Sequence, residues 1–150
     1  MDRTDRRILA LLQEDATLPV AELARRVQLS QTPCWKRVQK LKASGVIRKQ
    51  VALCDPAKLG LGTTVFVAVR TSQHNDVWLR KFDAAVKTIP EIVEVYRMSG
   101  EVDYLLRVVV ADIAGYDAVY RRLIKAVELS DVSSSFAMET IKSTTALPLA

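Results

Sequence analysis

The order of segment types between residues 63 and 141 constrains the fold of this chain more than any other feature. Alternating, β-branched residues predict strands at 63–71, 92–98, 104–110 and 132–141. Helical periodicity predicts helices at about 76–89 and 112–127, the second with apolar residues at i, i+3, i+4, i+7, i+8 and i+11. This β-α-β-β-α-β order predicts a ferredoxin-like domain, in which both helices cover one face of a four-stranded sheet.

The first of these strands is apolar on both of its faces. Val65, Val67 and Val69 alternate with Phe66 and Ala68, so the sheet face that carries no helix is also apolar. An apolar sheet face of this kind needs a cover. We therefore expect a homodimer that forms through this domain.

The first 56 residues have a different spacing of apolar residues. Apolar spacing, caps and breaks predict three short helices, at 4–15, from Pro19 onward and at about 31–43, and an alternating segment after residue 46 predicts one or two strands. Helix, tight turn, helix and β-ribbon is the outline of a winged helix-turn-helix, although a small helical bundle could imitate it. The predicted class is α+β, with a winged helix-turn-helix at 1–56, a wing and hinge at about 46–62, and a ferredoxin-like domain at 63–150.

The positive charge of the chain lies entirely in its first part. Residues 1–56 contain 11 Lys and Arg against 6 Asp and Glu, whereas residues 57–150 contain 11 of each. A basic module joined to a neutral one most often meets nucleic acid or an anionic membrane surface. The alternative is a solvated basic face without a partner.

Composition also limits the chemistry of the chain. Two cysteines and one histidine predict neither a disulfide framework nor a metal site, and we expect no cofactor. No apolar run approaches the roughly 18 residues of a membrane helix, and the N-terminus is charged, so we expect a cytoplasmic protein without membrane contact.

Two groups of segments resemble those of one known family. ELARRV and LSQTPCWKRVQKLKASGVI are similar to the DNA-binding signature of the Lrp/AsnC transcription regulators, and SGEVDYLLRVVV and TIKSTTALPL are similar to their amino-acid-responsive domain. The resemblance covers nearly the whole chain. It implies a regulator that binds double-stranded DNA, dimers that assemble into tetramers or octamers, and an amino-acid effector bound between dimers.

The helix predicted at 31–43 has two faces. Cys34, Val38 and Leu41 share the buried stripe, which makes Cys34 a core residue rather than a reactive thiol. The opposite face and the wing supply the predicted DNA-binding residues: Gln31, Thr32, Trp35, Lys36 and Gln39 near bases, and Arg37, Lys40, Arg48 and Lys49 near phosphates. Trp35 could lie against the sugar-phosphate backbone or pack on the first helix, and Arg48 and Lys49 have an alternative as solvated hairpin charges.

The turn before residue 104 is the predicted effector site. It can be an ordinary hairpin turn, but the resemblance implies that it borders the effector pocket. Asp103 suits an ammonium group, and loop amides suit a carboxylate. The resemblance extends this set to the last strand, and the predicted effector-binding residues are Ser99, Gly100, Glu101, Asp103, Ser135, Phe136 and Ala137.

Two other functions remain as alternatives to DNA-binding regulation. Glu101 and Asp103 could serve a small-molecule enzyme as a carboxylate pair, but no nucleophile, metal set or phosphate loop accompanies them. A ligand-storing oligomer is the other alternative. Both leave the basic N-terminal module without a role, so we expect a protein that is not an enzyme and has no catalytic residues.

Overall fold

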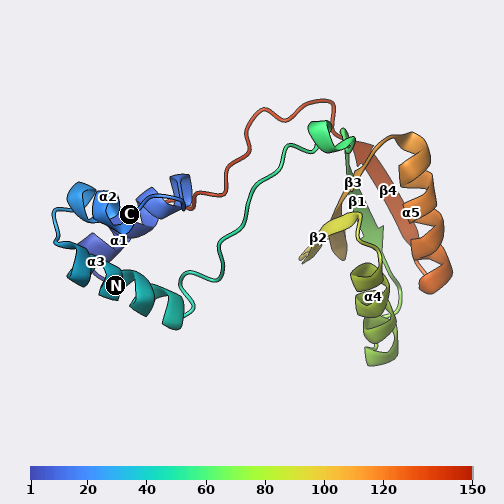
Figure 1. Ribbon diagram of the computed structural model, residues 1–150. Helices are drawn as coiled ribbons and strands as arrows, with labels where there is room; N and C mark the ends of the chain where they lie inside the picture. Colours follow the sequence, from blue (N-terminus) through green and yellow to red (C-terminus); the bar gives the residue numbers. More distant parts are fainter. Residues whose placement is uncertain (150) are drawn as a thin grey trace. The chain divides into compact units, whose positions relative to one another are not determined.

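The computed structural model describes residues 1–149, which form two compact units (Figure 1). One unit contains residues 1–53 together with the segment from Ile141 onward, and the other contains Cys54–Thr140. Within the first unit, the side-chain amide of Gln13 donates to the Leu147 carbonyl (3.2 Å) and accepts from the Leu147 N–H (2.7 Å). The expected domain of residues 63–150 stays a prediction.

The first unit consists of three helices, α1 (Arg3–Glu14), α2 (Val20–Arg26) and α3 (Gln31–Ala43). A capping box starts α1, in which the side chains of Asp2 and Asp5 each accept the other's backbone N–H. Gln28 ends α2 with a φ of 60°, and Gly45 follows the cap of α3 with a φ of 76°. The three predicted helices are therefore present, and local signals set their ends.

The core of the first unit joins all three helices. Its buried members share apolar side chains at helical spacing, and they are Ile8, Leu9, Leu23, Ala24, Val27, Cys34, Val38 and Leu41. Leu11, Leu12, Leu29 and Ile47 pack against this cluster from its margin. Cys34 is fully buried, as the spacing predicted, and burial raises the pKa of its thiol.

The strands predicted for the wing do not form. Residues 46–53 contain no helix or strand, and Val51 and Leu53 are mostly exposed. The apolar alternation there indicated which side chains would share a face, but a strand also needs a neighbour that accepts and donates its backbone hydrogen bonds. Within residues 1–149 this segment has no such neighbour.

The second unit has the predicted ferredoxin-like order. It comprises a short 3₁₀ turn η1 (Ala57–Leu59), β1 (Thr63–Arg70), α4 (Asp76–Thr88), β2 (Ile92–Arg97), β3 (Tyr104–Val110), α5 (Ile113–Ala126) and β4 (Asp131–Phe136). The sheet order is β2-β3-β1-β4, every neighbour is antiparallel, and α4 and α5 lie on one side of it (Figure 1). Asn75 caps α4 and Asp112 caps α5, each with its side-chain oxygen.

The two faces of this sheet differ in burial. Val65, Val67 and Val69 face the helices and are buried. On the other face Phe66 is 40% exposed, and it aligns with Arg107 on β3 and Ser135 on β4. We call this uncovered side, with Phe66, Tyr96 and Leu105, the open face.

Among residues 1–149, no helix is both long and apolar enough to cross a bilayer. In the same part of the chain, no three His, Cys, Asp or Glu side chains gather as metal ligands would.

Candidate functional site

The exposed face of α3 is polar and basic. α3 buries Cys34, Val38 and Leu41 on one side, so every turn of the helix presents its remaining side chains to solvent. The exposed residues of the predicted DNA-binding set on this helix are Gln31, Thr32, Trp35, Lys36, Gln39 and Lys40. Residues 1–53 hold 11 Lys and Arg against 5 Asp and Glu, a net charge of +6 around this face. A protruding helix of this composition suits the major groove of DNA.

Trp35 lies on the same face as the polar side chains. Its side chain is 50% exposed, and it does not belong to the buried cluster of the unit. Packing between helices normally removes most of the surface of an aromatic side chain from water. The observed exposure therefore leaves an apolar ring available to a partner.

Arg37 differs from the other predicted DNA-binding residues because it is already paired. Its Nη1 lies 2.7 Å from Asp2 Oδ2 and 2.7 Å from Asp5 Oδ1, and its side chain is only 34% exposed. The sequence had assigned Arg37 to phosphate and had not assigned Asp5 any role. In the sequence, Asp2 and Asp5 lie near the start of the helix predicted at 4–15, a position that suits a capping role but does not indicate a partner on α3.

Arg48 and Lys49 are exposed, but they do not lie on a hairpin. They belong to the segment after α3 that forms no strand. Both predicted roles of these residues assumed a hairpin, which does not form. Arg48 and Lys49 are instead two cations that follow the end of α3 closely in the sequence.

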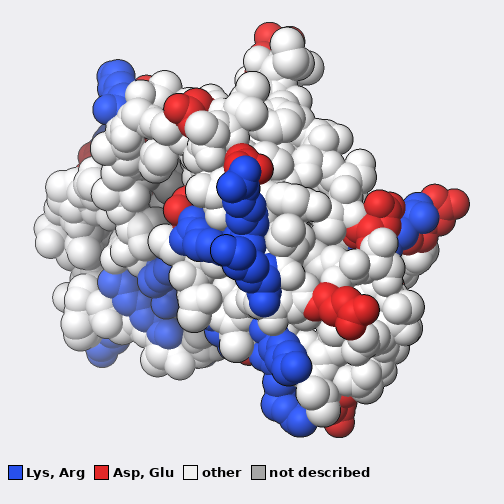
Figure 2. Space-filling model, turned by 90° about the vertical axis from the view of Figure 1, so that its right-hand side faces the viewer, with Lys and Arg blue, Asp and Glu red and all other residues white. Residues whose placement is uncertain are grey.

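Basic side chains also occur outside the first unit. Figure 2, viewed from the side on which α5 is drawn in Figure 1, shows Lys and Arg side chains that extend from the middle of the view toward its lower edge. Residues 54–140 nevertheless contain 10 Lys and Arg against 12 Asp and Glu. On α5, Arg121 pairs with Asp117 and Arg122 with Glu91. The excess positive charge therefore belongs to the first unit.

The predicted effector turn is held by its own hydrogen bonds. Asp103 Oδ2 accepts from the Thr71 N–H (2.8 Å), and the Asp103 N–H donates to the Val69 carbonyl (3.0 Å). Gly100 has a φ of 116°, a conformation that L residues rarely adopt. Glu101 is exposed and pairs with Arg70 at 3.2 Å. Asp103 thus builds the turn, with one carboxylate oxygen engaged by the backbone.

The two parts of the predicted effector site lie at different ends of the sheet. Val69 aligns with Tyr104, next to the turn, whereas Phe66 aligns with Ser135. Four residues separate the level of Asp103 from that of Ser135, which corresponds to about 13 Å along the strands. One copy of the chain therefore does not bring the turn and the end of β4 together.

Neighbouring residues on β4 also point to opposite faces. Phe136 packs edge-on against the ring of Tyr116 on α5, with centroids 5.4 Å apart, so Phe136 faces the helices. Ser135 therefore faces the open side. Ala137 continues the strand through its N–H, which donates to the Thr64 carbonyl at 2.9 Å.

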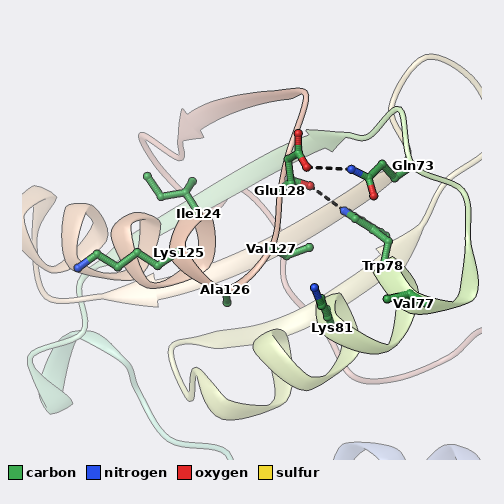
Figure 3. A pocket seen from close by; sticks show the side chains of 9 residues that line it. All are labelled: Gln73, Val77, Trp78, Lys81, Ile124, Lys125, Ala126, Val127 and Glu128. Atoms are coloured by element: carbon green, nitrogen blue, oxygen red, sulfur yellow. Dashed lines mark hydrogen bonds between the residues drawn. The ribbon is translucent and has the colours of Figure 1, made fainter.

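A hollow of about 290 Å³ lies between the start of α4 and the end of α5, and Figure 3 shows its lining. Trp78 Nε1 donates to the Glu128 carbonyl (2.7 Å), and Gln73 Nε2 donates to Glu128 Oε2 (2.8 Å). These bonds join the two helix ends. None of the predicted effector residues lines this hollow.

Comparison with known protein families gives two matches, one in the N-terminal and one in the C-terminal part of the chain. Residues 1–42 match the AsnC-type helix-turn-helix domain, and residues 64–147 match the Lrp/AsnC ligand binding domain. The second match alone covers more than half of the chain.

Relatives of similar length match the chain over nearly its whole length and are named as transcriptional regulators. The DNA-binding transcriptional activator DecR of Escherichia coli K12 is 51% identical over 150 residues, 99% of each chain. An AsnC family transcriptional regulator from Agrobacterium tumefaciens is 61% identical, covers 99% of this chain and 97% of its own, and superposes with a TM-score of 0.95. A transcriptional regulator from Neisseria meningitidis, solved in complex with L-Met, is 35% identical, with 99% and 96% coverage and a TM-score of 0.94. These proteins are named as regulators and not as enzymes.

Proposed function

Because this chain belongs to the Lrp/AsnC family of transcriptional regulators, we propose that it is a sequence-specific DNA-binding regulator controlled by an amino acid. The observation that carries this proposal is the exposed face of α3 in a unit of high positive charge. In a helix-turn-helix, the second of the two helices enters the major groove with its exposed polar face, while its apolar face packs on the rest of the domain.

The exposed side chains on α3 divide by the DNA chemistry that they suit. Gln31 offers an amide for the N6 and N7 edge of adenine, Thr32 offers a methyl group for thymine, and Lys36 suits guanine or phosphate. Gln39 and Trp35 extend the same face along the helix. Their combined role is to discriminate between sequences.

Phosphate contacts come from cations beside this face. Lys40 lies one turn after Lys36, and Arg48 and Lys49 follow the end of α3. Contacts of this kind fix the register of the protein on the duplex and make binding depend on salt.

A homodimer completes this arrangement. The open face of the second unit leaves Phe66 and Tyr96 40% and 52% exposed, and a second copy that covers it would bury both rings. A two-fold dimer has two α3 helices, which reach successive major grooves about 34 Å apart. The operator is therefore an imperfect palindrome with half-sites one helical turn apart, and larger assemblies of dimers in the cytoplasm would bend it.

A mobility-shift titration of DNA from upstream of the chain's own gene tests DNA binding. We expect tighter binding than to random DNA of equal length, and an affinity that falls as salt rises. Lys36→Gln should weaken binding, whereas Lys87→Gln, the same charge change on α4, should not. Equal affinity for both DNAs, or no dependence on salt, would reject the proposal.

The effector proposal rests on the second unit. An amino acid presents an ammonium and a carboxylate group, and the turn Ser99–Asp103 offers a carboxylate and backbone amides for these two charges. The separation of this turn from Ser135 supports a site that uses more than one copy. The L-Met complex of the Neisseria meningitidis regulator supports the ligand class. A ligand held between copies shifts the balance of assemblies by its differential affinity for them.

A thermal-shift screen of the twenty amino acids tests this part. A ligand that binds only the folded protein raises its Tm as its concentration rises. We expect a small subset to do so, and Asp103→Asn to abolish the shift while Asp83→Asn on α4 preserves it. If no amino acid changes the Tm, the effector proposal fails while the DNA-binding proposal stands.

A further inference from the structure

Arg37 connects two helices through three charged groups. Asp2 and Asp5 cap α1 by accepting each other's backbone N–H at 2.8 and 3.0 Å. The second oxygen of each carboxylate accepts from Arg37 Nη1 at 2.7 Å. One guanidinium nitrogen on the middle of α3 is thus bound to both carboxylates at the start of α1. We call these three residues the Arg37 clamp.

The surroundings of the clamp separate it from the other cations of α3. Met1, Lys36 and Lys40 line the same surface hollow as the clamp residues. Neither lysine forms an ion pair within the part of the chain that is described, residues 1–149. Lys36 and Lys40 are therefore available to an anionic partner, whereas Nη1 of Arg37 is bound to two carboxylates.

The clamp disfavours phosphate binding by Arg37. Both of its bonds to carboxylates use Nη1. A phosphate that approached the remaining guanidinium N–H groups would come close to the Asp2 and Asp5 carboxylates, and like charges repel. The hydrogen bonds that Arg37 donates to Asp5 and Asp2 also raise the pKa of Arg37, which is the direction expected for a satisfied ion pair.

We propose that Arg37 is a positioning residue of the DNA-binding unit, which ties α3 to the start of α1 and contacts no phosphate itself. The proposal rests on the DNA-binding function argued above and refines it. By fixing α3 against α1, the clamp sets the angle at which Gln31, Thr32 and Lys36 meet the base edges. The energetic effect of Asp2 and Asp5 on DNA binding is therefore favourable, although both are negatively charged.

The test is whether Asp2 and Asp5 strengthen or weaken DNA binding. The full-length chain is titrated with DNA from upstream of its own gene, and with random DNA, at several salt concentrations. The variants are Arg37→Gln, the double variant Asp2→Asn with Asp5→Asn, and all three changes together. Asn is as good an N-cap as Asp, so the double variant keeps the start of α1 while it removes the ion pairs.

A positioning role predicts that the single and double variants lose specific affinity by a similar amount, roughly tenfold, the value of one base contact. The triple variant should be no worse than either of them, because all three remove the same clamp. Affinity for random DNA and the slope of log K against log salt should stay as in the wild type. Lys40→Gln is the matched control, and it should reduce the slope by about one.

A phosphate-binding role for Arg37 predicts different results. If Arg37 binds phosphate, Arg37→Gln lowers the salt slope by about one, and the double variant tightens binding because it releases Arg37 and removes two negative charges. Loss of specific and random binding in equal proportion, with a reduced folded fraction by circular dichroism, also overturns the proposal, because it assigns the clamp to stability alone. A wild-type chain that does not bind its upstream DNA refutes the function itself.

Discussion

At the scale of single residues, backbone conformation matters most at Gln28. It ends α2 in the left-handed region, with its N–H donating to the Arg25 carbonyl and the Leu29 N–H donating to the Ala24 carbonyl. This is the hydrogen-bond pattern of a Schellman motif, in which glycine is the usual residue. The tight turn between α2 and α3 depends on this conformation, and through it so does the exposure of α3.

Gln28→Gly should therefore stabilise the protein. The change removes the steric cost of a Cβ at positive φ, and part of this gain is offset by the greater freedom of glycine in the unfolded chain. We expect the free energy of unfolding to rise by about 0.5 to 1 kcal/mol in urea denaturation. Gln28→Ala keeps the Cβ and should show no such gain. Destabilisation by glycine would contradict this account of the turn.

Trp35 supplies a second prediction at this scale. The chain has two tryptophans, and Trp35 is 50% exposed whereas Trp78 is 3% exposed. Iodide should quench mainly Trp35, and DNA from upstream of the gene should protect it. Trp35→Phe should remove the accessible fraction. Unchanged quenching in a sample that a mobility shift shows to be bound would mean that Trp35 lies outside the interface.

At the scale of helices and strands, the sequence predicted best where the signals are local. Asp2, Asn75 and Asp112 cap α1, α4 and α5, and these helices begin within one residue of the predicted starts at 4, 76 and 112. The strand at 104–110 has the predicted bounds because its alternation matches a sheet with one buried face. The wing was predicted wrongly, since alternation at 46–56 does not reveal whether a neighbouring strand exists.

Prediction of the site residues was also limited to features that local sequence signals determine. The exposed side of α3 follows from the stripe of Cys34, Val38 and Leu41, because helical geometry places the remaining residues opposite. The pairing of Arg37 with Asp2 joins residues that are far apart in the sequence, so no local pattern indicates it. The distance between the effector turn and Ser135 depends on strand register, which only the assembled sheet defines.

Ion pairs within α2 predict how stability depends on pH. Hydrogen bonds from Arg25, and then from Arg26, lower the pKa of Glu22 from 4.5 to about 2. Because the folded pKa is the lower one, the stabilisation is present above pH 4.5 and is lost as pH falls toward 2. NMR titration of the Glu22 carboxyl should give a pKa near 2, and Glu22→Gln should flatten this part of the stability profile. A pKa near 4.5 would show that the pairs do not persist in solution.

At the scale of the whole molecule, self-association follows from the open face. Tyr96 and Arg107 both donate hydrogen bonds to Glu94 on this face. The open face therefore combines apolar rings with a carboxylate whose hydrogen-bond partners lie within the same chain. A surface of this composition suits a specific contact with a second copy.

Phe66→Glu should disrupt that contact, because it places a charge at the centre of the open face. Light scattering after gel filtration should show a lower mass than for the wild type. Ile113→Glu is the matched control, since Ile113 is 71% exposed at the start of α5, and its mass should be unchanged. An unchanged mass for Phe66→Glu would place the interface elsewhere.

The central claim is that the exposed face of α3 reads DNA sequence, and affinity for single-base variants of the operator tests it most directly. Gln31→Ala should lose discrimination at one base pair in each half-site, a change of about 1 to 3 kcal/mol there, and keep it elsewhere. Lys40→Gln should weaken binding to all variants by the same factor. If Gln31→Ala and Lys40→Gln both leave the ranking of the variants unchanged, α3 is not the reading helix.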